Sequence, residues 1–370
     1  MKKTVLASLF SILLLASFSA STIPREWAES PHNNREMGSQ TLQQVPVEIR
    51  GEGTRHCARC HSEQGFLAWL EQLKQGNPGH LVGPDGRLAT VEHLRSLGLT
   101  QADVRPITCQ TCHDADWNLR VVNNTPVLPS GFQASAVGAG ALCMVCHSTR
   151  EGKISWNAAD HGRYTSPHYS AQGDVLLGKN AYFVDDTQEW LNPHAHFTGG
   201  SCVTCHMRLT REEYTSHTFK APENLCTSCH GPKFQREMVA QGFEQLMKQV
   251  EARISQRVAA VSNRIRTVRA YNPETGQFTP NVAVEGRVRR VEILSAAGQI
   301  ALRLVLEDGR ELISQLGDIR DGEGQPVFPT GDPVVRAAWN YLLLKYGGAR
   351  GVHNPTYTYT VLTATLEALK

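Results

Sequence analysis

The stretch Cys57-Ala58-Arg59-Cys60-His61 is the first of five Cys-x-x-Cys-His motifs in this sequence of 370 residues. The other four are Cys109-Gln110-Thr111-Cys112-His113, Cys143-Met144-Val145-Cys146-His147, Cys202-Val203-Thr204-Cys205-His206 and Cys226-Thr227-Ser228-Cys229-His230. Together the motifs use all ten cysteines of the chain. No cysteine is therefore left over for a disulfide or a separate free thiol.

The spacing within each motif matches the chemistry of covalent haem attachment. Two thiols must reach the two vinyl groups on one edge of a porphyrin, and cysteines three residues apart lie on one face of a helical turn. The next residue then directs its imidazole toward the iron from the same side. Because this pattern is the attachment signature of c-type haem, we predict five haem c groups. The predicted proximal iron ligands are His61, His113, His147, His206 and His230.

Other uses of Cys-x-x-Cys pairs explain the pattern less well. Zinc sites use such pairs, but a histidine would not then follow all five of them. Redox dithiols use them too, although five in one chain would be unusual. Disulfide bonds are a third alternative, since the first residues of the chain indicate an oxidising compartment.

Residues 1–21 read as an export signal. Lys2 and Lys3 form a charged start, Val5 to Phe18 is an apolar run, and Ser19-Ala20-Ser21 is an acceptable cleavage site. An uncleaved membrane anchor is the alternative. We expect an exported protein, located in the periplasm, at the cell surface or outside the cell. Haem attachment also takes place after export.

Charge gives a weaker constraint on partners. The formal net charge is +2 and includes the two lysines of the predicted signal, so the mature polypeptide is close to neutral. Nothing in this balance indicates a nucleic-acid partner. Each haem would add two propionates, so we expect several arginines to lie close to them.

We predict a mainly α-helical fold with extensive loops and a core ordered by haem. Residues 22–233 hold all five motifs, show weak periodicity and are expected to form a pentahaem domain with short helices at the motifs. Residues 234–270 carry apolar side chains at spacings of three and four, which predicts a long amphipathic helix.

The last part of the chain predicts a small module. Between residues 280 and 320 the alternating pattern indicates an antiparallel sheet, with strands near 287–294, 299–306 and 311–315 and a tight turn at Asp308-Gly309. Residues 331–370 should form C-terminal helices, one starting at Asp332-Pro333 and one near Thr356. The sheet carries no catalytic signature, so it is either a spacer or a docking surface.

The number of further iron ligands decides whether the haems are open or closed, because a second histidine closes the free face of the iron. Ten histidines lie outside the motifs: His32, His56, His80, His93, His161, His168, His194, His196, His217 and His353. Proline precedes or closely follows His32, His168, His194 and His353, and such a stiff backbone suits a fixed ligand. His217 lies nine residues before Cys226, and Trp27 and Trp190 precede His32 and His194.

Several of these short motifs resemble a known class of bacterial multihaem cytochromes. They are Trp27 to His32 before the first attachment motif, Ser166-Pro167-His168, Asn192-Pro193-His194 before the fourth motif, Ser216-His217-Thr218-Phe219, and Gly351-Val352-His353-Asn354-Pro355 after a long helix. They look like the wider class that includes cytochrome c nitrite reductases and hydroxylamine oxidoreductases. The resemblance departs from that class in two respects, since the chain has no Cys-x-x-Cys-Lys unit and carries the additional sheet.

The resemblance implies that His32, His168, His194, His217 and His353 are distal iron ligands, giving bis-histidine ligation. His196 is the alternative to His194, and His80, His93 or His161 could replace His32. His56 adjoins Cys57 and is more simply a surface residue or a propionate contact. The sequence does not pair distal ligands with individual haems.

Two functions remain open at this point. The first is electron transfer between redox partners, such as cytochromes or quinol-linked donors, in the periplasm or toward extracellular acceptors. A homo-oligomer or filament is a further possibility, in which His32 would reach a haem of a neighbouring subunit. The second is a haem oxidoreductase acting on a small nitrogen or sulfur compound at one open haem, with His161, His196 or Arg163 as acid-base groups.

Overall fold

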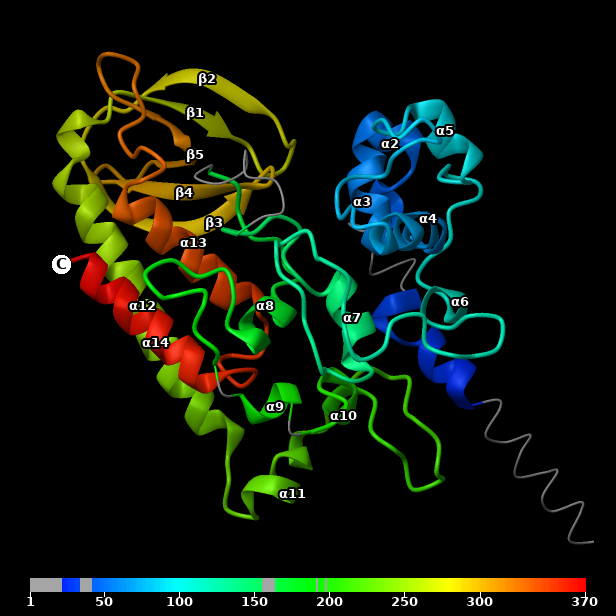
Figure 1. The fold of residues 1–370 in the computed structure, drawn as a ribbon. Helices are drawn as coiled ribbons and strands as arrows, with labels where there is room; N and C mark the ends of the chain where they lie inside the picture. Colours follow the sequence, from blue (N-terminus) through cyan, green and yellow to red (C-terminus); the bar gives the residue numbers. More distant parts are fainter. Residues whose placement is uncertain (1–21, 34–41, 155–163, 191, 197) are drawn as a thin grey trace, which may run out of the picture. The chain divides into compact units, whose positions relative to one another are not determined.

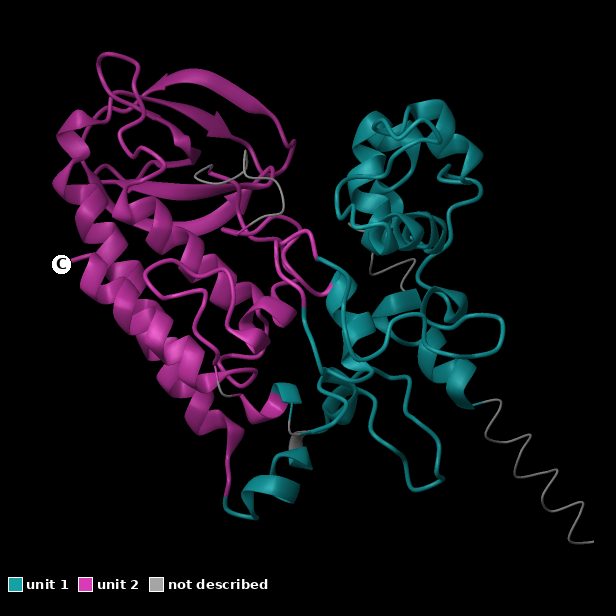
Figure 2. Cartoon of the chain, in the orientation of Figure 1, with its two compact units in different colours: residues 1–127, 134–146, 195–233 teal, residues 128–133, 147–194, 234–370 magenta. Residues whose placement is uncertain are grey.

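The computed structural model describes residues 22–33, 42–154, 164–190, 192–196 and 198–370. The predicted export signal, His161 and Arg163 lie outside the described residues. The fold is mostly helical with many loops, one antiparallel sheet and C-terminal helices, which confirms the predicted fold class. The chain divides into two compact units, which Figure 2 shows in separate colours.

Unit 1 comprises residues 1–127, 134–146 and 195–233 and consists of short helices joined by loops. Residues 22–28 are also helical. The remaining elements, labelled in Figure 1 where there is room, are η1 (Pro31–Asn33), η2 (Leu42–Gln44), α2 (Val47–Arg50), η3 (Gly51–Gly53), α3 (Thr54–His61), α4 (Glu63–Lys74), α5 (Val91–Ser96), α6 (Cys109–Cys112), α7 (Gly140–Cys146), α10 (Cys202–His206), η5 (Glu223–Leu225) and α11 (Thr227–His230).

Among the described residues of unit 1 the longest helix is α4, which packs against α3, the helix that carries the first motif. Ser62 caps α4 by accepting a hydrogen bond from the Gly65 amide. Phe66, Trp69 and Leu70 of α4 are almost fully buried. A Cβ at Gly65 would lie only 2.3 Å from the Ala58 carbonyl oxygen, so the close approach of the two helices requires glycine there.

Unit 2 comprises residues 128–133, 147–194 and 234–370. The short helix α9 (Pro193–His196) includes the point at which the chain passes from unit 2 to unit 1. The other elements of unit 2 are α8 (Gln172–Leu177), α12 (Arg236–Ala260), η6 (Ser262–Arg264), β1 (Thr267–Tyr271), β2 (Phe278–Ala283), β3 (Val288–Ala296), β4 (Gln299–Leu306), β5 (Glu311–Arg320), α13 (Pro333–Tyr346) and α14 (Pro355–Ala368).

The sheet has the strand order β2-β1-β5-β4-β3, and its paired strands are antiparallel. The predicted strands correspond to β3, β4 and β5, and the Asp308-Gly309 turn joins the last two. β3 is an edge strand whose backbone is satisfied from outside the sheet. The Ser255 hydroxyl of α12 bonds to both the amide and the carbonyl of Val291, and the Ser262 hydroxyl accepts from the Val288 amide. Covering the edge in this way leaves fewer groups open to pairing with another chain.

The long helix is shorter than predicted, because α12 ends at Ala260 rather than near residue 270. Val261, Ile265 and Val268 continue the helical spacing, but β-branched residues also favour strands. In the structure Val268 lies in β1, which pairs with β5 and β2. The sheet therefore begins at Thr267, and β1 and β2 were both missed by the sequence pattern.

The apolar core of unit 2 lies between the sheet and the helices α12, α13 and α14, which pack against one another. Leu342, Leu343 and Val361 are essentially fully buried there, together with Leu302 and Leu304 of β4. Asp332 caps α13 by accepting from the Val334 amide, as the Asp-Pro pair predicts. None of the helices in the described part of the chain is both long and apolar enough to cross a bilayer.

The predicted domain boundary near residue 233 coincides with a boundary between the two units, but residues 147–194, predicted to lie in the pentahaem domain, belong to unit 2. Ala171, Val175 and Ala181 are part of the apolar core formed by the C-terminal helices. The Tyr357 hydroxyl donates to the Lys179 carbonyl, and the Trp339 indole donates to the Asn180 carbonyl. Long-range contacts of this kind leave no periodic signal in the sequence.

Candidate haem-binding site

Each of the five motifs lies on a short helical turn. The cysteines of the first four motifs lie within α3, α6, α7 and α10, and Cys226 is the N-cap residue of α11. The second motif is fixed by a capping box, in which the Thr108 and Thr111 side chains each bond to the other's backbone amide. Both thiols of a motif are thus presented from one turn, as attachment to one porphyrin edge requires.

Four of the thiols, those of Cys112, Cys143, Cys146 and Cys205, have a raised pKa, which favours the protonated form. Burial, with a smaller effect of nearby Cys109, raises the pKa of Cys112 to about 11. A hydrogen bond with Cys60, followed by burial, raises the pKa of Cys146, and contact with Cys202, followed by burial, raises that of Cys143. Redox-active dithiols depend on a lowered cysteine pKa. Cys202 alone among these shows a lowered pKa, caused first by its hydrogen bond with Cys143.

The structure also gives no support to disulfides or to a cysteine zinc site. All ten cysteines are in the described part of the chain, and none of them forms a disulfide. Among the described residues, no cysteine belongs to a set of three or more metal-ligand atoms that converge on one point. Structural zinc needs four such ligands.

Carbonyl oxygens orient five of the predicted iron ligands. In each case the Nδ1–H group of the imidazole donates the hydrogen bond. His113 donates to the Trp117 carbonyl (2.9 Å), His206 to the Phe219 carbonyl (3.0 Å) and His217 to the Thr215 carbonyl (2.7 Å). His194 donates to the Val352 carbonyl (3.1 Å) and His147 to the side-chain carbonyl of Gln172 (3.3 Å). A carbonyl oxygen can only accept, so Nδ1 carries the proton in each of these contacts, and Nε2 is the ring nitrogen that could bind an iron.

Polar contacts join the first two motifs within unit 1. Glu63, two residues after His61, is almost fully buried and forms an ion pair with Arg105 at 2.7 Å. Its carboxylate also accepts a hydrogen bond from the Thr108 hydroxyl at the start of α6. Arg59, inside the first motif, is buried and donates to the Pro78 and Gly79 carbonyls. These residues set the positions of two attachment sites relative to each other.

The third and fourth motifs are joined by a glycine contact between the starts of α7 and α10. A Cβ at Gly138 would lie 2.1 Å from the Gly199 carbonyl oxygen, and one at Gly140 would lie 1.8 Å from the Ser201 hydroxyl oxygen. The Ser201 hydroxyl donates to the Val137 carbonyl at 2.8 Å. The backbones can approach this closely only because side chains are absent. The approach brings the thiols of Cys143 and Cys202 close enough for each to affect the pKa of the other.

Replacing Gly140 with alanine should destabilise unit 1 by about 1–3 kcal/mol, the usual cost of overpacking a close contact. The added methyl group must push Ser201 away and separate α7 from α10. Gly53→Ala is the matched control, because its nearest neighbour would be the Arg50 Cβ at 3.8 Å, an ordinary contact. Thermal unfolding of the two variants checks this. Equal midpoints would show that the glycine contact does not constrain the two motifs.

Two predicted distal ligands of unit 1, His32 and His217, both contact Phe219. The ring centroids of His32 and Phe219 are 4.2 Å apart in an edge-on arrangement, and those of His217 and Phe219 are 6.0 Å apart. Phe219 also accepts the His206 hydrogen bond through its carbonyl. The Glu26 carboxylate accepts from the His217 amide and the Tyr214 hydroxyl, so it links helical residues 22–28 to this cluster.

His194 and His353 are brought together in unit 2 by asparagine side chains. Asn192 donates to the carbonyls of Leu176 (2.6 Å) and His353 (2.8 Å), and Asn354 donates to the same Leu176 carbonyl (3.1 Å). The His194 ring is held in turn by Val352. Two histidines that lie far apart in the sequence are therefore fixed by one polar cluster.

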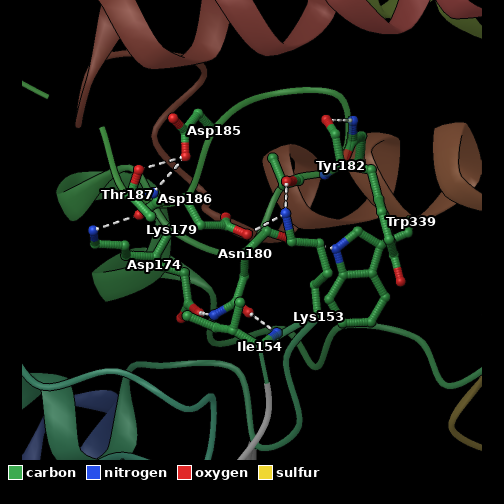
Figure 3. A network of polar contacts seen from close by, with 12 residues as sticks. Lys153, Ile154, Asp174, Lys179, Asn180, Tyr182, Asp185, Asp186, Thr187 and Trp339 are labelled. Carbon is green, nitrogen blue, oxygen red and sulfur yellow. Dashed lines mark hydrogen bonds and ion pairs between the residues drawn. The ribbon is translucent and has the colours of Figure 1, made fainter. Parts of the chain in front are cut away.

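The segment after the third motif is held by the buried carboxylate of Asp174 (Figure 3). The amide and hydroxyl of Thr149 donate to Asp174 at 2.7 and 2.9 Å, and the Asn180 side chain donates at 2.7 Å. The Gly173 amide donates to the His147 carbonyl at 2.8 Å. Burial raises the pKa of Asp174 to about 6, although these hydrogen bonds partly offset it.

Asp174→Asn should change how stability depends on pH. Since the folded-state pKa is about 6 and the unfolded-state value is about 3.8, the folded protein binds more protons between these values. Protonated Asp174 contributes on the order of 3 kcal/mol to the free energy of unfolding. This contribution is complete below the unfolded-state pKa and is lost as the pH rises through about 6. The free energy of unfolding of the variant should therefore fall further below that of the wild-type protein as the pH is lowered from 7 to 4.5, as measured by denaturant titration.

Asp185→Asn is the control for this experiment. Hydrogen bonds from Thr187 lower the pKa of the exposed Asp185, so the effect of its replacement should shrink as pH falls. If Asp174→Asn behaved in the same direction as Asp185→Asn, the buried carboxylate would not carry the raised pKa.

The other described histidines outside the motifs, among them the alternative distal ligands His80, His93 and His196, have surroundings of their own. In unit 1, the Nδ1 of His56 and the Nε2 of His80 are 2.7 Å apart, so the two rings share a hydrogen bond with each other. His93 lies on α5, where its amide is capped by Thr90, and His196 is exposed at the end of α9. The supporting roles of Arg59, Gln172 and Asp174 were not predicted, because no motif marks them.

The residues present fit covalently attached haem. Paired thiols on one turn, an adjacent imidazole and Nδ1 protons held by carbonyls are the donor set that a c-type haem needs. No protein-family model matches the chain, and no curated protein matches it. In a comparison with solved structures, the fold is similar to that of the outer cell wall cytochrome OcwA, with a TM-score of 0.47 and 16% sequence identity. The match covers 93% of this chain and 50% of that cytochrome, so the chain spans about half its length.

Proposed function

We propose that this protein is an exported cytochrome with five covalently attached c-type haems that passes electrons between redox partners. One observation carries the proposal, namely the contact between thiols of different motifs. Within unit 1, α7 packs against both α3 and α10, and Cys60 raises the pKa of Cys146 while Cys202 raises that of Cys143, so thiols of different motifs lie close together. Porphyrins attached to thiols in contact must have adjacent edges. Adjacent haems suit electron transfer along a chain of cofactors.

Each haem would supply one-electron chemistry at its iron, and the polypeptide holds, spaces and insulates it. The motif helices fix the thiols, and carbonyl oxygens fix the imidazoles. Glu63, Thr108 and the contact of Gly140 with Ser201 fix neighbouring attachment sites. In this proposal His32, His168, His194, His217 and His353 close the remaining iron faces.

The partners in this proposal are other redox proteins, met through small transient interfaces in the periplasm or at the cell surface. The supporting features are the export signal read in residues 1–21 and the absence of any basic segment of the kind that binds nucleic acid. Assembly into a filament belongs to the same proposal, with His32 serving a neighbouring subunit.

The intact mass of the exported protein tests the haem count, and the optical and magnetic spectra test the ligation. We expect the mass of five haems and uniformly low-spin iron. A bare polypeptide, or one that carries zinc, would overturn the proposal. A high-spin haem that binds carbon monoxide or nitrite would instead favour the oxidoreductase alternative.

A matched variant makes the count specific. Replacing both Cys226 and Cys229 with alanine should remove one haem from the mass and leave four. These cysteines are chosen because their motif stands last and α11 is short, with four residues. An unchanged mass would mean that this motif does not attach haem.

A further inference from the structure

A pocket of about 410 Å³ in unit 2 contains the predicted distal ligand His168. Its walls come from two parts of the chain that no sequence pattern connects. His168, Tyr169 and Arg150 come from the segments after the third motif, and Ser295 and Gly298 come from the hairpin end that joins β3 to β4. Tyr346 of α13 completes the lining.

The hairpin end holds the segment that carries His168. The Ser166 amide donates to the Gly298 carbonyl at 3.0 Å, and the Ile300 amide donates to the Tyr164 carbonyl at 2.7 Å. The Ser166 and Ser295 hydroxyls lie 2.5 Å apart. These bonds fix the backbone two residues before His168. The sheet therefore positions this imidazole, which neither a spacer nor a docking surface would need to do.

Arg150 gives the pocket a positive charge. Its side chain is half-buried, and within the described part of the chain its guanidinium forms no ion pair or hydrogen bond. A Cβ on Gly298 would lie 3.1 Å from the Arg150 Nη2 atom, so the guanidinium rests against the bare glycine. A half-buried guanidinium without a protein partner in the described part of the chain favours binding of an anion. Arginine binds a carboxylate through two parallel hydrogen bonds.

We propose that this pocket receives the propionate edge of the haem bound by His168, that Arg150 neutralises a propionate there, and that the sheet module exists to build this wall. The inference rests on the proposed function. It assigns to the β3–β4 hairpin a role in setting the reduction potential of one haem.

Removing the charge of Arg150 should lower one reduction potential. Reduction adds one electron, supplied by a redox partner or an electrode, to Fe(III) and gives Fe(II), and a nearby cation favours the more negative reduced state. In the five-haem protein, Arg150→Gln should make reduction of one haem roughly tenfold less favourable, as for a unit charge acting over about 10 Å at an effective dielectric constant of about 20. That factor is about 59 mV for a one-electron couple. Arg150→Lys should restore most of it.

Two glycines of the same sheet provide a test that leaves the arginine in place. Gly298 (φ +79°) and Gly309 (φ +87°) both occupy hairpin turns with left-handed backbone, so alanine strains both similarly. Only at Gly298 would the methyl group meet Arg150, because a Cβ at Gly309 would have nothing within 4 Å. Gly298→Ala should shift the same potential as Arg150→Gln, and Gly309→Ala should shift none. Equal effects of the two alanines would overturn the proposal.

A soluble anion, rather than a haem propionate, is the other group that could bind to Arg150 in this pocket. Adding inorganic phosphate to the wild-type protein should leave all the potentials unchanged if a propionate occupies Arg150. A phosphate-dependent shift that Arg150→Gln abolishes would mean that the pocket binds soluble anions instead. If the protein carries five haems and none of their potentials changes in Arg150→Gln, this inference is wrong and the proposed function still stands. If the protein carries no haem, the proposed function is wrong as well.

Discussion

A chain of residues 22–370 made without haem should keep the core of unit 2 and lose much of unit 1. The apolar core that joins the sheet to α12, α13 and α14 consists entirely of unit 2 residues. The motif helices are short in comparison, with 8, 4, 7, 5 and 4 residues in chain order. Isolated helices under about 12–15 residues are marginal in water. In unit 1 the haems would replace the missing apolar packing.

Hydrogen exchange of residues 22–370, produced in the cytoplasm where haem is not attached, checks this expectation. Amides of α13 and α14 should stay protected, whereas those between residues 195 and 233 should exchange as an open chain. The exported protein with its haems is the control and should protect both regions. Equal protection of the two regions in the haem-free chain would show that unit 1 folds through its own side chains.

The sequence predicted the features whose cause is local. The five motifs, the Asp332-Pro333 start of α13 and the Asp308-Gly309 turn all depend on residues a few positions apart, and the structure contains the corresponding elements. The end of α12 was missed because Val261, Ile265 and Val268 satisfy a helical spacing and suit a strand as well. Pairing with β2 and β5 selects the strand at Val268, and no local pattern reports that pairing.

The sequence could not predict which histidines lie close together, because the fold brings them together through contacts between residues far apart in the sequence. His194 meets the neighbourhood of His353 through Asn192, which lies 161 residues before the carbonyl that it contacts. Phe219 gathers His32, His206 and His217 through its ring and its carbonyl. The sequence offered the proline beside several of these histidines as the available signal, and proline indicates a fixed backbone without indicating its neighbours.

The second large effect is expected from His353→Ala. The backbone at this position is held independently of the imidazole, because Asn192 bonds to the His353 carbonyl and Asn354 caps α14. The replacement should therefore leave the fold intact and remove one distal ligand. One of the five haems should become high-spin and bind carbon monoxide when reduced, so about a fifth of the haem absorbance should respond.

Added imidazole should return that haem to the low-spin state, since the space left by the side chain admits a free ligand. His93, on α5, is the matched control, because with His32 rather than His93 assigned as a distal ligand His93→Ala should leave every haem low-spin. If His353→Ala kept five low-spin haems, His353 would not be a ligand, and the polar cluster around Asn192 would hold His194 alone at an iron. If instead more than one haem became high-spin, the cluster would be shared between two irons, since His194 is fixed through Val352, the residue before His353.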